Sequence, residues 1–145
     1  MIFLDTNIFL RLLTSPTDTA TERMHHVAVR LFTDIRDGMV EATTTDLVLH
    51  EIFYVLTSER QYGLPDALAI GMVKPIIGYR GLKLPRAERD IILRAIDIWE
   101  RNPKLEFADS IVVARCQANG WHPATFDKAL ASIPEVTRWE PTTTE

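Results

Sequence analysis

The order of apolar segments along the chain constrains the fold more than any other feature. Ile2-Phe3-Leu4 is a short apolar run that stops at Asp5, a pattern typical of a strand buried on both faces of a parallel sheet. Further strand candidates lie at residues 40–43, 82–84, 121–126 and 136–139. Between these runs the apolar residues recur at the spacing of helices.

Local signals predict where the helices begin and end. A short helix is expected at 7–13. A second has a capping box at Thr19-Ala20-Thr21-Glu22, apolar residues at helical spacing from Met24 to Ile35, and a stop at Asp37-Gly38. Thr44 or Thr45 can cap the next helix, which we expect to reach about residue 63. Pro65 suits the start of another helix with a kink at Pro75. Two more helices are expected at 87–99 and 105–119.

Alternation of strands and helices predicts the α/β class, with a largely parallel sheet of about five strands. A chain of 145 residues without a repeat or linker is expected to form one domain over 1–140, followed by a short C-terminal tail at 141–145. A single cysteine, Cys116, cannot form an internal disulfide, which fits a reducing compartment. No signal peptide or membrane span is expected, so we predict a cytoplasmic protein with no membrane partner.

Several acidic residues lie beside apolar residues, where burying an isolated carboxylate costs free energy. Asp5 follows the first strand, Asp127 follows the strand candidate at 121–126, and Glu51 and Asp109 are each bordered by apolar residues. Sites in open parallel sheets form at the carboxyl ends of the strands. If these acids converge there they repel one another, and Mg²⁺ or Mn²⁺ would relieve that repulsion because hard cations prefer carboxylate oxygens.

Each acid also has a simpler interpretation. Asp5 can cap the helix that begins near Asn7, and Asp127 can cap a short helix at 128–131. Asp109 can be a first-turn residue stabilised by the helix dipole, and Glu51 can lie on a solvent-exposed helix face. The combination of acids, not any single one, points to a metal site.

Four motifs resemble those of PIN domains, and most closely those of VapC-type toxins: Phe3-Leu4-Asp5-Thr6-Asn7, the mid-helix Glu51, the run from Phe107-Ala108-Asp109-Ser110 to Ala114, and Ala124-Thr125-Phe126-Asp127-Lys128. The resemblance implies a three-layer α/β/α sandwich and metal-dependent cleavage of RNA. It implies that Asp5, Glu51, Asp109 and Asp127 bind Mg²⁺ or Mn²⁺ and are catalytic. It also implies supporting roles for the polar residues Thr6, Asn7, Ser110 and Thr125.

The same resemblance implies a homodimer and a cognate antitoxin protein as partners. Because the net charge is −4, RNA must be held by local basic residues, and Arg11 and Lys128 lie nearest in sequence to the expected site. An RNA-processing PIN nuclease without an antitoxin is an alternative within the family.

Two other classes fit the sequence less well. A haloacid-dehalogenase-like phosphatase would need a second aspartate where Asn7 stands, and a receiver-type signalling domain would need a lysine placed differently from Lys128. A nucleotide-binding module would need a glycine-rich phosphate loop, which the sequence lacks.

Overall fold

The computed structural model describes residues 1–142 and divides into two compact units, one from Met1 to Arg86 and the other from Ala87 onward. Both are dominated by helices, and the first also contains a small parallel sheet. This combination of helices with parallel strands agrees with the predicted α/β class. Among residues 1–142, no helix combines the length and apolar character needed to cross a bilayer.

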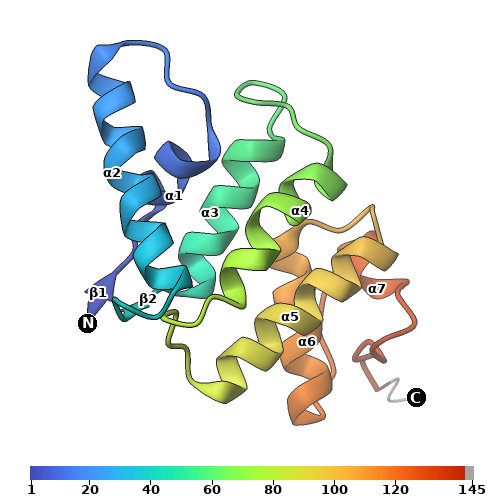
Figure 1. Ribbon diagram of the computed structural model, residues 1–145. Helices are drawn as coiled ribbons and strands as arrows, with labels where there is room; N and C mark the ends of the chain where they lie inside the picture. Colours follow the sequence, from blue (N-terminus) through green and yellow to red (C-terminus); the bar gives the residue numbers. More distant parts are fainter. Residues whose placement is uncertain (143–145) are drawn as a thin grey trace. The chain divides into compact units, whose positions relative to one another are not determined.

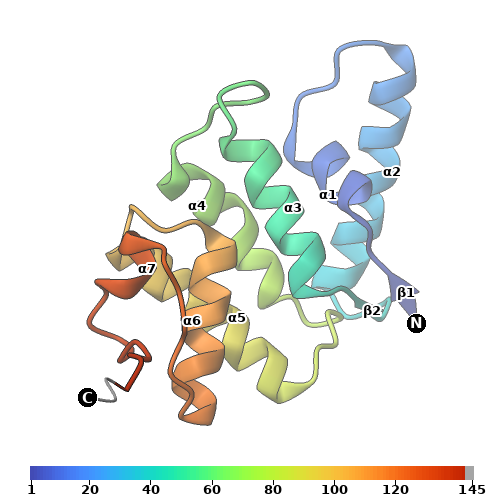
Figure 2. The ribbon, with the colours of Figure 1, turned by 180° about the vertical axis from the view of Figure 1, so that it is seen from behind.

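The sheet lies at the N-terminal end of the first unit (Figures 1 and 2). Strand β1 (Ile2–Phe3) pairs in parallel with β2 (Ala42–Thr43), with Ile2 opposite Ala42 and Phe3 opposite Thr43. Leu82 extends the sheet through a parallel bridge to Ala42. The predicted strand at 82–84 is therefore present as a single bridge.

Helices α1 (Thr6–Leu13), α2 (Thr19–Arg36), α3 (Asp46–Thr57) and α4 (Asp66–Ile77) complete the first unit. Asp5, Asp18 and Thr45 each cap the helix that follows, because a side-chain oxygen accepts a hydrogen bond from an otherwise unpaired backbone N–H. Pro65 precedes α4, and Pro75 lies within its last turn.

The core of the first unit forms where these helices pack against one another. Phe9 on α1 and Phe32 on α2 are almost fully buried, and their ring centroids are 5.1 Å apart. The other large side chains that are fully buried in this unit are Leu4, Ile35, Leu49, Ile52, Phe53, Leu56, Ile77 and Leu82. Leu4 anchors the chain at the point where β1 passes into α1.

The second unit contains α5 (Arg86–Arg101, which begins at the unit boundary), α6 (Phe107–Asn119) and the short α7 (Lys128–Ala131). The guanidinium of Arg115 on α6 donates to both carboxylate oxygens of Glu88 on α5, at 3.1 and 3.0 Å. Gly120 ends α6 in a left-handed conformation with φ of 68°, which glycine adopts without a steric penalty.

Two of the expected strands do not form. Residues 121–126 and 136–139 have no regular strand structure and share one backbone bond, from Trp139 N–H to the Pro123 carbonyl, at 2.9 Å. Pro123 lacks a backbone N–H and interrupts the ladder that a strand here would need. The expected sheet of about five strands is accordingly not confirmed.

The first strand is also less buried than predicted. The exposed fractions of Ile2 and Phe3 are 42% and 54%, so only Leu4 of the initial apolar run is buried. Within residues 1–142 the sheet consists of β1, β2 and the Leu82 bridge, and it does not cover β1 on both faces.

Two helix boundaries differ from those predicted. Asp18, not Thr19, caps α2 and forms the capping box with Thr21. Helix α3 ends at Thr57, because the Ser58 carbonyl accepts from the N–H groups of Gln61 and Gly63 in a turn. Residues 143–145 of the expected C-terminal tail lie outside the described residues.

Candidate metal site

Asp5 lies directly after β1, at the carboxyl end of the strand, as the sequence predicts. Its side chain is exposed, and Oδ1 accepts a 2.7 Å hydrogen bond from the backbone N–H of Thr6 at the start of α1. The helix-cap interpretation of Asp5 is therefore correct. The cap uses Oδ1, and the negative charge of the carboxylate sits at the positive end of the α1 dipole.

Thr6 brings Asp5 and Glu51 together although they are far apart in sequence. The Thr6 side chain is 4% exposed, and its hydroxyl donates to Glu51 Oε2 across 2.8 Å. Glu51 itself is exposed on α3. One buried threonine thus holds one oxygen of each carboxylate, through its backbone N–H for Asp5 and its hydroxyl for Glu51.

A second threonine fixes the strand end from which Asp5 projects. Thr44 is buried, and its hydroxyl donates to the Leu4 carbonyl at 2.9 Å, while the Leu4 N–H donates to the Thr43 carbonyl at 2.8 Å. The last residue of the apolar run is therefore held on both its backbone polar groups. The sequence alone indicates Thr44 as a possible helix cap. Its position directly after a strand could also have indicated a contact with the neighbouring strand.

The carboxylate oxygens of Asp5 and Glu51 in the first unit are suitable ligands for a hard divalent cation. Carboxylates are the preferred ligands of Mg²⁺ and Mn²⁺, and the two hydrogen bonds to Thr6 leave further oxygens of Asp5 and Glu51 available. Within residues 1–142, no three side chains of histidine, cysteine, aspartate or glutamate form a metal-binding group. Two acids and accompanying waters match the habit of Mg²⁺, which keeps several waters and binds few carboxylates.

In the second unit, Asp109 lies in the first turn of α6. This position is the one that its simpler interpretation gave. Its Oδ2 also accepts from the Glu106 backbone N–H at 3.0 Å, so Asp109 takes part in capping the helix, which was not predicted. Ser110 is fully buried, and its hydroxyl donates to the Glu106 carbonyl at 3.1 Å. Ser110 therefore fixes the backbone around Asp109 and makes no described bond to the carboxylate.

Asp127 caps α7, as its simpler interpretation predicted. Its Oδ1 accepts from the backbone N–H groups of Ala129 and Leu130, at 2.9 and 3.3 Å. Thr125 supports this turn, because its hydroxyl accepts from the Asp127 backbone N–H at 3.0 Å. Lys128, an expected RNA contact, is exposed at the first position of α7.

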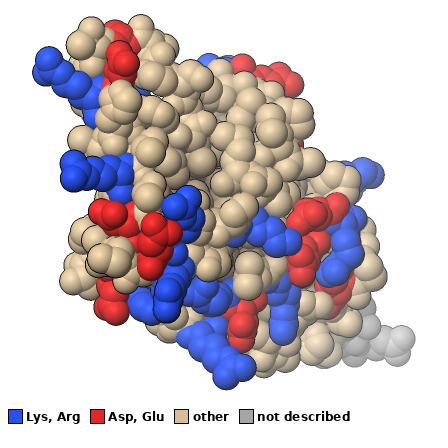
Figure 3. Space-filling model, in the orientation of Figure 1, with Lys and Arg blue, Asp and Glu red and all other residues tan. Residues whose placement is uncertain are grey.

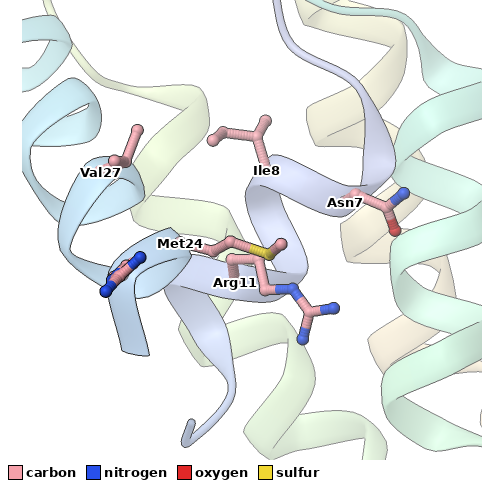
Figure 4. A pocket seen from close by; sticks show the side chains of 6 residues that line it. Asn7, Ile8, Arg11, Met24 and Val27 are labelled. Atoms are coloured by element: carbon pink, nitrogen blue, oxygen red, sulfur yellow. The ribbon is translucent and has the colours of Figure 1, made fainter. Parts of the chain in front are cut away.

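Asn7 and Arg11 line a pocket between α1 and α2 that the sequence did not reveal (Figure 4). Ile8 and three residues of α2, namely Arg23, Met24 and Val27, complete the lining. The spacing of these three residues along α2 places them on one face of the helix, and this is the sequence feature that could have indicated the pocket.

Charges of both signs are interspersed on the face shown in Figure 3. Hydrogen bonds from the N–H and hydroxyl of Thr21 lower the pKa of the Asp18 carboxyl, and the positive charge of Arg11 acts in the same direction.

Burial raises the pKa of the Cys116 thiol, so this cysteine is suited to packing and poorly suited to nucleophilic chemistry.

A PIN domain family model matches residues 2–136, which includes nearly all of the first unit and most of the second. The chain belongs to the PIN domain family. A search of curated proteins found no match. PIN domains are generally nucleases and typically use divalent metal ions, which places this chain in a class of metal-dependent nucleases.

Proposed function

We propose that this chain is an Mg²⁺- or Mn²⁺-dependent endoribonuclease whose metal ligands and catalytic acids are Asp5, Glu51, Asp109 and Asp127. The observation that carries the proposal is the Thr6 bridge, which holds Asp5 and Glu51 by bonds of 2.7 and 2.8 Å. Two carboxylates held at one buried residue repel each other, and a shared cation offsets that repulsion. The order of the four acids within a PIN match over 2–136 supports the rest of the set.

In this proposal the residues of the chain orient the acids and the substrate. Thr6 fixes one oxygen of Asp5 and one of Glu51, and the remaining oxygens of these carboxylates would hold the cation. Asn7, Ser110 and Thr125 support the acids, while Arg11 and Lys128 contact RNA phosphates. When bound, the cation lowers the pKa of a water molecule and offsets the charge on the scissile phosphate.

The reaction is hydrolysis of an RNA phosphodiester by water. Water adds to phosphorus in line with the departing 3′ oxygen, which takes up a proton, so the products carry a 5′-phosphate and a 3′-hydroxyl. The 2′-hydroxyl of the RNA takes no part. No protein nucleophile is needed, which agrees with the raised pKa of the Cys116 thiol.

The direct test is cleavage of purified cellular RNA with Mg²⁺ or Mn²⁺, with the ends mapped by sequencing. We expect EDTA to stop cleavage and Asp5→Asn to lower the rate at least about 100-fold, because a neutral amide is a poor ligand for a hard cation. Asp90→Asn, at an exposed position on α5, is the matched control and should cleave like the wild type. Cleavage that persists in EDTA, or in Asp5→Asn, would overturn the mechanism.

We further propose that the enzyme is the toxin of a type II toxin–antitoxin pair and that it forms a homodimer. In this proposal residues 1–140 act as one cytoplasmic domain of three layers, α/β/α. Exposed apolar side chains support a protein partner: Leu47 and Tyr54, on one face of α3, are 72% and 55% exposed, and Leu68 on α4 is 51% exposed. Figure 3 shows few charges over α3 and α4.

An RNA-processing nuclease without an antitoxin is the second candidate. The catalytic residues would be the same in both, so the difference lies in the gene neighbourhood. A small gene immediately upstream whose product binds and inhibits this chain supports the toxin, and its absence favours RNA processing.

A further inference from the structure

The pocket between α1 and α2 has a volume of about 470 Å³, within the roughly 300–1,000 Å³ usual for sites that hold small ligands. Figure 4 shows Ile8 on α1 and Met24 and Val27 on α2 gathered along the gap between the two helices, with the Arg11 guanidinium beside the Met24 side chain. The pocket is therefore an apolar surface with guanidinium groups beside it.

Two contacts join α1 and α2, the helices that form the walls of this pocket. The Nδ1 atom of His25 on α2 lies 2.7 Å from the Arg11 carbonyl oxygen, which ties α2 to the last turn of α1. Phe9 on α1 and Phe32 on α2 also pack against each other in the core, with ring centroids 5.1 Å apart. A pocket built on two packed helices needs little rearrangement to receive a ligand.

Apolar atoms in the pocket remain open to solvent. The exposed fractions of Met24 and Val27 are 48% and 62%. Arg11 lies near enough to Asp18 to lower the pKa of its carboxyl, yet within residues 1–142 neither Arg11 nor Arg23 forms a described salt bridge. The pocket thus offers an apolar surface together with positive charge, and no acidic residue lines it.

An unpaired nucleotide has the complementary chemistry. Its base presents a flat apolar face, its phosphates are anionic, and arginine binds phosphate through two parallel hydrogen bonds. Figure 4 shows the Asn7 amide pointing away from Met24 and Val27, so Asn7 borders the pocket and is not part of the surface that takes the base. Asn7 also directly follows Thr6, the residue that holds Asp5 and Glu51, so a nucleotide here would be close to the proposed point of cleavage.

We propose that the α1–α2 pocket is a subsite that holds one unpaired nucleotide of the RNA next to the scissile phosphate. Its base lies on Met24 and Val27, and its phosphates contact Arg11 and Arg23. This assignment rests on the proposed ribonuclease function and adds to it a reason for selecting single-stranded over paired RNA.

The test uses the full chain and a fluorescent single-stranded oligoribonucleotide, with binding measured by anisotropy in EDTA so that no cleavage occurs. Arg23→Gln should weaken binding about tenfold and reduce the dependence of log Kd on log salt by about one unit, because one phosphate contact is lost. Met24→Glu, which places a negative charge in an exposed part of the pocket, should weaken binding further. Arg30→Gln, two turns along α2 and outside the pocket, is the matched control.

Cleavage kinetics with Mg²⁺ complete the test. We expect Arg23→Gln and Met24→Glu to raise KM with little change in kcat, with melting temperatures near that of the wild type. If wild-type protein cleaves RNA and both variants keep its KM and Kd, the subsite is wrong while the ribonuclease stands. If the variants instead lose only the binding of an acidic peptide, the pocket is a protein site and the subsite is again wrong. Wild-type protein that neither binds nor cleaves RNA overturns the proposed function itself.

Discussion

Thr6 is the residue that contacts both carboxylates of the candidate site in the first unit. It is 4% exposed, its N–H donates to Asp5 and its hydroxyl donates to Glu51. In the proposed mechanism it is a positioning residue, because it touches neither substrate nor cation and acts only through the two carboxylates.

Replacing Thr6 by valine or by serine distinguishes its role in positioning the Asp5 and Glu51 carboxylates from its contribution to the stability of the fold. Each variant should lose about 1 kcal/mol of unfolding free energy, the valine through the lost hydrogen bond and the serine through the lost buried methyl group. Only the valine should lower kcat for RNA cleavage, by about 10- to 100-fold, as is usual when a partner of a ligand is removed. Equal kcat values in the two variants would show that the Thr6–Glu51 bond has no part in the reaction.

At the scale of elements, the loop that follows α4 approaches other backbone unusually closely. The Gly81 N–H donates to the Ile35 carbonyl at 2.7 Å, and its own carbonyl accepts from the Ala42 N–H at 2.9 Å. A Cβ atom at this position would lie 2.7 Å from the Ile35 carbonyl oxygen and closer still to that of Val40. Only glycine allows this loop to join the end of α2 to the sheet.

We therefore expect Gly81→Ala to lower the unfolding free energy by about 2–3 kcal/mol, since two backbone segments must move apart. Gly71→Ala is the matched comparison, because nothing lies within 4 Å of its Cβ position in α4. That variant should gain about 0.5–1 kcal/mol from higher helix propensity. Urea denaturation measures both changes, and a stable Gly81→Ala protein would refute the close approach.

The helices were largely predictable, and so were the positions of β1, β2 and the Leu82 bridge, whereas the strands expected at 121–126 and 136–139 were wrong. The clear apolar stripe of α5 and the glycine that ends α6 are local features, so sequence alone located them. Strands depend on partners far away in the chain, and the apolar composition of residues 121–126 did not outweigh Pro123. The Asp18 cap was missed because Thr19 also fits the first position of a capping box.

At the scale of the whole molecule, the sequence indicates four acids as candidate ligands but not the long-range contacts that these acids make. The order of Asp5, Glu51, Asp109 and Asp127 could be read from the sequence, and the caps at Asp5 and Asp127 were foreseen as simpler interpretations. The Thr6–Glu51 bond joins residues 45 positions apart, and no local pattern predicts such a contact. The α1–α2 pocket depends in the same way on how two helices pack.

The most direct test of the proposed metal site is Mn²⁺ binding measured by electron paramagnetic resonance, in wild-type protein and in Asp5→Asn, Asp109→Asn and Asp90→Asn. If Asp5 and Asp109 bind the same metal ion, Asp5→Asn and Asp109→Asn should each weaken Mn²⁺ binding at least about tenfold, because each removes a charged ligand. Asp90→Asn should bind Mn²⁺ like the wild type. Mn²⁺ affinity that falls in Asp5→Asn but stays at the wild-type value in Asp109→Asn would contradict the proposed metal site.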